Sequence, residues 1–370
     1  MNIHNEFIFI CQVIPADLSI VDKRISQAGN NYANKLIQLL KPKLSISLLP
    51  IFLMNYDLSS YNDSKYVSIC SNSILPYRFH VVYRLFRDTF KAFILIQKRE
   101  VRNILFYNLD KQNFMLVCLV RLLLRRKTFV LVADHWSFNS STFLERAINY
   151  ILKKINGVIV LNSNIKVNVN QQLLPGLLID DEIKIVKQNS INRNVLLSGS
   201  LGKTTGLILA LECFSSNKTC DLYISGRPYG FKENEFNEII ESYTRKHQNI
   251  HFLGLLDYDS YLKLVDKCDI ALSLRNPNDP EHQFNFPSKI LEYLSKSKIV
   301  ISSIHYRDIN DDLLFNTEFN SKSLSSTLNI IFNLEEKQIM HYKRYVHKCL
   351  LSNFGSESLN GALTNLINYK

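Results

Sequence analysis

Residues 269–303 read DIALSLRNPNDPEHQFNFPSKILEYLSKSKIVISS, two apolar strand-like segments separated by a helical pattern. Pro287 suits the first position of that helix, where its missing N–H costs nothing. The backbone amides of Ser288 and Lys289 would then point outward from a helix N-terminus, where phosphate groups bind. Glu292 lies one turn further along and can accept hydrogen bonds from two vicinal hydroxyls, such as those of a ribose. The stretch therefore predicts a nucleoside-diphosphate site, and a capped amphipathic helix with solvated charges is the alternative.

The alternation of strands and helices extends along most of the chain. Strand-like segments lie at 6–13, 44–53, 103–107, 128–133 and 157–161. Helical patterns separate them at 29–40, 77–100, 111–126 and 142–155. After a polar interruption, helices at 205–215, 232–246, 258–267 and 287–297 alternate with strands at 195–199, 221–225, 250–254, 269–274 and 299–303. Such alternation is typical of parallel sheets that are covered by helices.

A chain of 370 residues is too long for one ordinary core. We therefore predict an α/β protein with two Rossmann-like parallel-sheet domains, residues 1–185 and 186–350, that face each other across a cleft. Two last helices are expected at 325–350 and 357–368, and the segment 351–370 is expected to pack back on the first domain. Ligands of such folds bind at the carboxyl ends of the strands.

The composition predicts a cytoplasmic protein with an anionic partner. Residues 1–16 lack the basic start of a secretory signal, and no apolar run reaches the roughly 18 to 20 residues that span a bilayer. The seven cysteines show no CxxC motif and no metal-ligand spacing with histidine, which is typical of reduced, buried thiols. The net charge of +11 leaves open a membrane, a phosphorylated ligand or nucleic acid.

Residues 195–211, VLLSGSLGKTTGLILAL, have the strand, glycines, lysine and threonine of a phosphate-binding loop. The P-loop pattern places four residues between its two glycines. Only Ser200 and Leu201 separate Gly199 from Gly202, so this loop is too short to wrap a β-phosphate in that way. We therefore reject a nucleoside-triphosphatase loop.

Taken together, these motifs resemble the signature of glycosyltransferase family 4 and its relatives, which share the GT-B fold. The match covers roughly 195–303 through LLSGSLGKTTGLILALECF, LYISGRPYG, NIHFLGLLDYDSYLKLVDKCDIAL and FNFPSKILEYL, in the family's order and spacing. It is weaker in the first domain, where AGNNYANKLIQLL carries it. The variant with FPSK before EYL looks like enzymes that build bacterial capsule, exopolysaccharide or O-antigen chains.

The resemblance implies which residues of the second domain hold the donor diphosphate. Gly199 belongs to the glycine loop that approaches it, and Lys203 is the candidate for a charge that many relatives supply as arginine at the position of Ser200. Arg275 matches an arginine that follows the strand before the FPSK loop, where it would contact the diphosphate. Arg227, after LYISG, is a weaker candidate because a solvated arginine at a strand end is commonplace.

One departure from the family pattern concerns the donor sugar. The family commonly shows two glutamates eight positions apart, and counting back from Glu292 gives Phe284. Glu281 and His282 are near enough in sequence to take the place of the first glutamate. Residues 295–298, SKSK, stand where relatives usually have a glycine, which makes a non-catalytic partner of a true transferase one alternative.

Two segments of the first domain supply further candidates. Asp134 and His135, in VLVADHWSF, fall at the carboxyl end of a predicted strand, where family members touch the transferred sugar or the acceptor. A loop cap and an ordinary polar residue are the alternatives. Gly29 and Asn30 match the family's loop that closes on the donor phosphate, and a helix N-cap is the alternative for Asn30.

The residues DYD at 257–259 do not predict a metal site. They directly follow FLGLL and begin a helix, where aspartates are ordinary N-terminal caps. The resemblance implies that helix dipole, lysine and arginine neutralise the leaving diphosphate, so we expect neither a metal nor another cofactor.

The basic charge has a candidate location in residues 77–102. Phe79, Val82, Phe86, Phe90 and Phe93 form one face of a helix, and basic residues form a stripe beside it: Arg84, Arg87, Lys91, Lys98 and Arg102. Such a helix suits an anionic membrane surface. The alternative is that the aromatic face packs on the sheet. No nucleic-acid recognition motif accompanies the patch, so we expect no nucleic-acid partner.

The sequence thus predicts a sugar transfer from a UDP- or GDP-sugar to a lipid-linked oligosaccharide, at the inner face of the cytoplasmic membrane. The resemblance implies that the anomeric configuration is retained. A nucleotide-sugar epimerase of the same fold is a further alternative, which would need no acceptor and no membrane surface.

Overall fold

The structure is a computed structural model of the chain. It describes residues 7–13, 27–48, 67–69, 77–109, 111–133, 142–184, 190–279 and 288–369. The chain forms two compact units. Unit 1 comprises Met1–Leu177 and Ser356–Lys370, and unit 2 comprises Leu178–Gly355.

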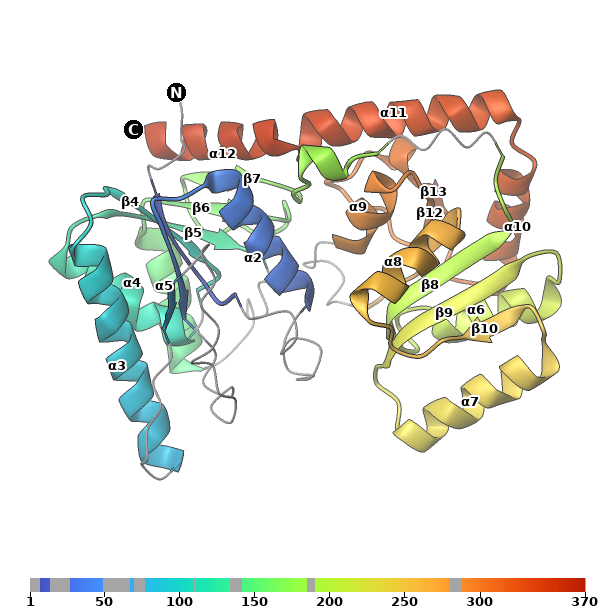
Figure 1. Ribbon diagram of the computed structural model, residues 1–370, viewed down its shortest axis with the longest axis horizontal. Coiled ribbons are helices and arrows are strands. Elements are labelled where there is room, and N and C mark those ends of the chain that lie inside the picture. The colour runs from blue at the N-terminus through green and yellow to red at the C-terminus, as the bar shows by residue number, and fades with distance from the viewer. Residues whose placement is uncertain are drawn as a thin grey trace. The chain divides into compact units, whose positions relative to one another are not determined.

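Unit 1 contains a parallel sheet whose described strands follow the order β3-β2-β1-β4-β5-β6-β7 (Figure 1). The strands are β1 (Phe7–Cys11), β2 (Leu44–Leu48), β3 (Val67–Ile69), β4 (Asn103–Tyr107), β5 (Lys127–Val132), β6 (Gly157–Val160) and β7 (Gln171–Leu173). The central strands read as continuous apolar runs because helices cover both faces of the sheet. The helices of this part are α2 (Gln27–Leu40), α3 (Tyr77–Gln97), α4 (Lys111–Leu123) and α5 (Phe143–Lys154).

Unit 2 repeats this architecture with the order β10-β9-β8-β11-β12-β13 among its described strands. They are β8 (Asn194–Leu201), β9 (Asp221–Pro228), β10 (Ile250–Phe252), β11 (Ile270–Ser273), β12 (Ile299–Ser302) and β13 (Phe315–Asn316). The helices are α6 (Leu207–Ser216), α7 (Glu233–Lys246), α8 (Tyr258–Lys267), α9 (Ser288–Ser295), α10 (Ser321–Phe332) and α11 (Glu336–Phe354). Both sheets have the doubly wound Rossmann order, which confirms the predicted fold class.

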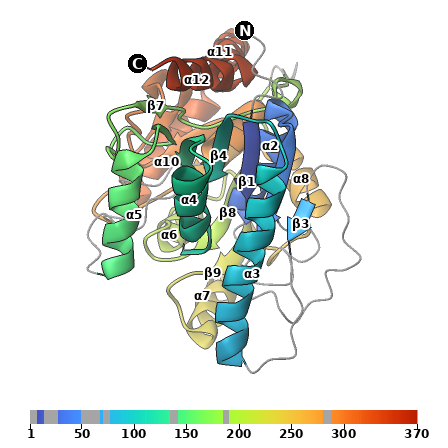
Figure 2. The same ribbon diagram turned by 90° about the vertical axis from the view of Figure 1, so that its left-hand side faces the viewer.

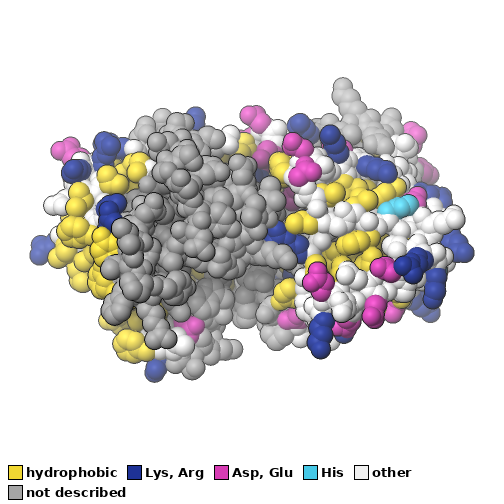
Figure 3. Space-filling view, turned by 60° about the horizontal axis from the view of Figure 1, so that its bottom comes forward, with side chains coloured by type: hydrophobic (Ala, Val, Ile, Leu, Met, Phe, Trp, Pro, Cys, Tyr) yellow, Lys and Arg dark blue, Asp and Glu magenta, His cyan; other side chains and the backbone are white. Residues whose placement is uncertain are grey.

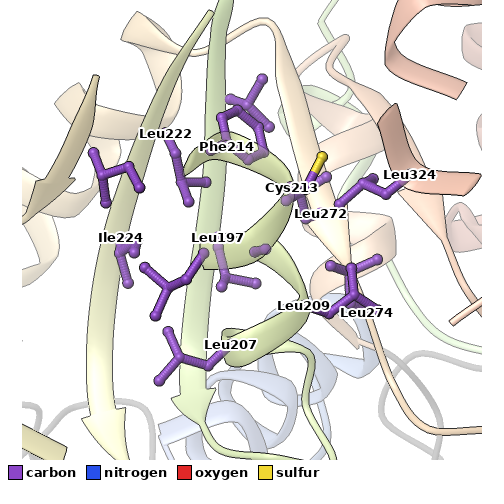
Figure 4. Close-up of a cluster of buried hydrophobic side chains, with 14 of the residues drawn as sticks. Leu197, Leu207, Leu209, Cys213, Phe214, Leu222, Ile224, Leu272, Leu274 and Leu324 are labelled. Carbon is purple, nitrogen blue, oxygen red and sulfur yellow. The ribbon is translucent and has the colours of Figure 1, made fainter. Parts of the chain in front are cut away.

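One core cluster of unit 2 lies between its sheet and helix α6 (Figure 4). Leu207 and Phe214 of α6 are fully buried against Leu197 of β8 and Leu222 of β9, and Leu324 of α10 closes the cluster. Each such side chain contributes about 1.5–3 kcal/mol on burial. This core fixes the carboxyl end of β8 relative to the neighbouring strands.

The unit boundaries differ by several residues from those predicted. The first unit ends at Leu177 rather than at 185, because Leu178 and Ile183 are buried in the core of unit 2. The Leu178 N–H also donates to the carbonyl of Phe354 at 2.7 Å, which keeps the end of α11 in unit 2 beyond the predicted 350.

The predicted helix at 325–350 is wrong in one respect, since it consists of two helices. α10 ends before Asn333, whose N–H closes its last turn, and Glu335 begins α11 in a capping box with Gln338. The Glu335 N–H donates to the side-chain oxygen of Gln338 at 2.9 Å, so the local sequence stops one helix and begins the next.

Helix α12 (Ser356–Asn368) belongs to unit 1, as predicted for the C-terminal segment. The buried amide of Asn170 donates to the carbonyls of Leu366 at 2.9 Å and Asn156 at 2.7 Å. The Leu366 carbonyl lies in the last turn of α12 and has no partner within its own helix. Gly157 leaves room for this contact, since a Cβ there would meet the Asn170 amide at 2.6 Å.

We expect Asn170→Ala to destabilise unit 1 by about 1–3 kcal/mol, because it leaves a buried helix-terminal carbonyl without a donor. Urea unfolding followed by circular dichroism measures the effect. Asn365→Ala is the matched control, since Asn365 is exposed on the same helix. Equal unfolding free energies for the two variants would contradict the capping role.

Candidate functional site

The candidate site lies at the carboxyl ends of β8 and β11 in unit 2. These strands are neighbours, and the order of strands reverses between them, since β9 and β10 lie on one side and β12 and β13 on the other. Ligands of doubly wound sheets bind at such a switch point. Of the predicted residues of unit 2 that the structure describes, Gly199 lies in β8, Arg275 follows β11, and Ser288, Lys289 and Glu292 lie in α9.

Lys289, in the first turn of α9, is held in place by neutral groups. Its Nζ donates to the Ser198 hydroxyl of β8 at 3.0 Å and to the Tyr261 hydroxyl of α8 at 3.3 Å. The ammonium also lies 4.7 Å from the ring centroid of Tyr261 and 5.8 Å from that of Tyr293. Within the described residues, no carboxylate pairs with it. Among the described residues, the charge is therefore positioned but not neutralised, and two of its three N–H donors are used.

The hydroxyls around Lys289 form a short network. The Ser198 and Tyr293 hydroxyls are 2.8 Å apart, and Tyr293 is almost completely buried. Burial raises the pKa of Tyr261 strongly, and the neighbouring Tyr293 and Glu292 raise it further. Tyr261 therefore stays neutral at ordinary pH and does not cancel the lysine charge.

Two glycines allow the backbone to come close to this lysine. Gly199 has φ +118°, and a Cβ there would lie 3.1 Å from the Lys289 Cε. Gly226 of β9 is its register partner, with φ +153°, and a Cβ at that position would clash with the Gly199 carbonyl oxygen. Both positions therefore require glycine, and the stem of Lys289 passes over the end of β8.

The loop after β8 is closed on itself. The Thr205 hydroxyl accepts from the Gly202 N–H at 2.7 Å and lies 2.6 Å from the Ser200 carbonyl. Gly206, with φ +77°, lets the loop approach Leu274, which follows β11. The Asn276 N–H then donates to the carbonyl of Thr204 at 2.8 Å. This loop ties the ends of the two central strands together.

Lys203, which the sequence suggested as a contact of the donor diphosphate, pairs with a carboxylate in the structure. Its Nζ forms a 3.0 Å ion pair with Glu235 of α7, and its side chain is 63% exposed. The hydrogen bond from Lys203 is also the main cause that lowers the pKa of Glu235. Lys203 therefore has a carboxylate partner, whereas Lys289 contacts only neutral groups among the described residues.

Arg275 and Arg227 lie at strand ends on the same edge of the sheet. The backbone of Arg275 is fixed by the Ser303 hydroxyl, which accepts from its N–H and donates to its carbonyl, both at 2.7 Å. Arg227 is the second-last residue of β9 and the register partner of Ser200. Both arginines are half-buried.

The remaining candidates of α9 lie beside Lys289. Ser288 is the first residue of α9 and is exposed. Glu292 is half-buried one turn along. Burial raises the pKa of Tyr258 of α8, and the negative charge of Glu292 raises it further.

Several predicted residues lie outside the described residues. They are Pro287, Glu281, His282, Phe284, Asp134 and His135. Gly29 and Asn30 are described in the first turns of α2, and the Asn30 carbonyl accepts from the Asn34 amide at 3.1 Å. Because α2 already includes Gln27, Asn30 is not an N-cap, and that alternative is wrong.

The aspartates at 257–259 have the capping role expected for them. Asp257 is the N-cap of α8, and its carboxylate accepts from the Ser260 N–H at 2.9 Å. That bond holds the pKa of Asp257 below its usual range. No cluster of three or more His, Cys, Asp or Glu with metal-binding geometry occurs within the described part of the chain.

Sequence reasoning missed the three residues that hold Lys289. Ser198 directly precedes Gly199, Tyr293 directly follows Glu292, and Tyr261 comes four residues after the cap of α8. Their adjacency to predicted site residues was the available signal for the first two. Tyr261 gave none, because its contact with Lys289 spans 28 positions and exists only through the packing of α8 against α9.

No family model matches the sequence, and no curated protein matches it significantly. Solved structures do match. HepE of Anabaena in complex with UDP and glucose has a TM-score of 0.70 at 13% identity, covering 99% of this chain and 100% of that chain. A glycosyltransferase of Rickettsia africae has 0.68 at 16% identity, covering 98% and 99%. Sucrose-phosphate synthase of Thermosynechococcus elongatus has 0.68 at 12% identity, covering 97% of both chains. The likeness shows the fold, which is the GT-B fold of two Rossmann-like domains.

Proposed function

We propose that the chain is a glycosyltransferase of the family 4 type that uses a nucleotide-sugar donor, UDP- or GDP-linked. The observation that supports this most directly is the Lys289 ammonium, fixed by neutral hydroxyls at the switch point of unit 2. A positive charge that no described carboxylate neutralises, beside a helix N-terminus, suits a diphosphate. The structure of HepE, which has the same fold, contains UDP and glucose. This supports UDP as the first nucleotide to test.

The proposed roles follow from the charges that develop when the donor bond breaks. The leaving diphosphate gains negative charge, and preorganised positive groups stabilise that change. Lys289, the amides of Ser288 and Lys289, and Arg275 would supply them, and Glu292 would bind the ribose hydroxyls. Since these groups can neutralise the diphosphate, we propose that transfer needs no metal or other cofactor.

The finer part of the proposal concerns the acceptor. We propose a lipid-linked saccharide in capsule, exopolysaccharide or O-antigen synthesis, with retention of configuration, at the inner face of the cytoplasmic membrane. Asp134 and His135 would orient the transferred sugar or the acceptor. The resemblance to enzymes of the FPSK type and the basic helix α3 support this assignment.

Thermal unfolding of the purified chain with UDP, GDP, ADP and CDP tests the donor site. Ligand at about 100 times its dissociation constant adds about 2.7 kcal/mol of apparent stability. We expect a rise in the melting temperature with UDP or GDP and none with ADP or CDP, which names the base. No rise with any of the four would contradict a donor site in this chain.

Incubation with donor alone and with acceptor separates the alternatives. An epimerase of this fold would isomerise the nucleotide sugar in the absence of acceptor. A non-catalytic partner would bind the nucleotide without releasing it from the donor. We expect release of UDP or GDP that increases when a lipid-linked saccharide is added.

A further inference from the structure

Helix α3 of unit 1 exposes a row of large apolar side chains. Val82, Phe86 and Phe90 are 54%, 59% and 59% exposed, and their spacing of four residues places them along one side of the helix. We call these three residues the α3 ridge. Figures 1 and 2 show that the first turns of α3 extend past the strands of unit 1. Asp88 and Thr89, which lie between Phe86 and Phe90 in the sequence, are each 1% exposed, so the ridge lies on the outer side of the helix and not on its packed side.

The packing of α3 does not use the ridge. Its inner side is formed by Ala92, Phe93 and Ile96, which are buried, and Phe90 meets Phe93 with ring centroids 6.4 Å apart. The carboxyl end of α3 is held by Arg126, whose guanidinium donates to the Ile96 carbonyl at 2.8 Å. Of the predicted aromatic face, Phe93 packs inward while Phe86 and Phe90 face solvent.

Basic residues are frequent in and after α3. Residues 77–127 contain twelve Lys and Arg against three Asp and Glu, although Arg126 and Lys127 bind the carbonyls of Ile96 and Ile367. Arg87 and Lys91 follow the ridge residues along the helix, and the Arg87 guanidinium lies 5.6 Å from the ring centroid of exposed Tyr83. In Figure 3, yellow apolar surface bordered by dark blue basic side chains is visible at the left, over unit 1.

We propose that the α3 ridge docks into the surface of an anionic lipid bilayer. Apolar side chains enter the boundary between headgroups and acyl chains, while flanking lysines and arginines contact the anionic headgroups. Nucleic acid fits less well, because the centre of the patch is apolar and would face phosphates. The helix lies in the surface plane, and no helix of the described residues has the length and hydropathy of a membrane span. The purpose of docking, delivery of a lipid-linked acceptor, rests on the proposed function.

Flotation with vesicles tests the docking surface. We expect the 370-residue chain to float with vesicles of 30% phosphatidylglycerol in phosphatidylcholine and to stay in solution with phosphatidylcholine alone. Phe86→Ser/Phe90→Ser should lower the affinity about tenfold or more, because the inserted apolar area is lost. Arg87→Gln/Lys91→Gln should lower it about fivefold per charge and reduce its salt dependence. Ile330→Ser is the matched control, since Ile330 is an exposed apolar residue on α10 of unit 2.

Several outcomes would overturn the proposal. Equal binding to neutral and anionic vesicles would contradict it, as would unchanged binding of the Phe86→Ser/Phe90→Ser variant. An equal loss of vesicle binding in Ile330→Ser would also contradict it, and so would a dimer or a DNA complex that depends on the ridge. The melting-temperature shift with UDP is measured on the same variants. A ridge variant that loses vesicles and keeps the UDP shift supports the surface. Loss of the UDP shift in the wild-type chain contradicts the proposed function and leaves the vesicle result standing.

Discussion

Replacement of Lys289 by methionine is expected to weaken UDP binding about ten- to a hundredfold. A hydrogen bond to a charged group contributes about 1.5–3 kcal/mol, and the variant removes both the charge and the donor. Methionine keeps an apolar stem beside Gly199 and between Tyr261 and Tyr293, so the helix packing is retained. Isothermal titration measures the dissociation constant.

The same titration with uridine sharpens this prediction. Lys289 would contact the diphosphate, so uridine should bind the Lys289→Met variant as it binds the wild-type chain. Glu292→Gln should weaken both UDP and uridine, because its carboxylate would bind the ribose that both ligands share. Lys263→Met is the control, since Lys263 is an exposed lysine on α8. An unchanged UDP affinity in Lys289→Met would contradict the site.

The second large effect is expected at Gly226. A Cβ at this position would overlap the carbonyl oxygen of Gly199, and φ +153° is a conformation that other residues rarely adopt. The paired strands β8 and β9 would have to separate, or the backbone of β9 would have to change. We expect Gly226→Ala to lower the free energy of unfolding by about 3–5 kcal/mol, the sum of a clash and a strained backbone.

Gly230→Ala is the comparison for that variant. Gly230 also has positive φ, +71°, but nothing lies within 4 Å of a Cβ built there. It should therefore cost only the backbone conformation, about 1 kcal/mol. Urea unfolding of both variants separates the clash from the conformational cost, and similar losses would show that the close approach to Gly199 is unimportant.

The sequence predicted the elements that carry strong local patterns. The helix at 258–267 and the strand at 103–107 have the bounds of α8 and β4. The edge strands β3, β7 and β13 were not predicted, because two or three residues give no periodicity. The helix predicted at 325–350 is interrupted after Asn333, and this interruption was not predicted. No glycine or proline marks it; it is formed by the C-cap Asn333 and the capping box at Glu335.

The sequence could predict only the part of the site whose residues lie close together in one segment. Lys289, Ser288 and Glu292 share one helix, so their spacing showed that they lie together. The partner of Lys203 could not be predicted, because Glu235 is 32 positions away and reaches it from another helix. Long-range contacts of this kind depend on how helices pack, which local patterns do not encode.

The position of α12 has a consequence for the order of events during synthesis. Unit 2 is one continuous segment, whereas unit 1 needs α12, which buries Leu359, Leu363 and Leu366. The ribosome makes α12 after all of unit 2. Nascent domains usually fold in the order in which they emerge. Here unit 2 can complete its core first. Unit 1, although most of it is synthesised earlier, can complete its own core only after α12 has been synthesised.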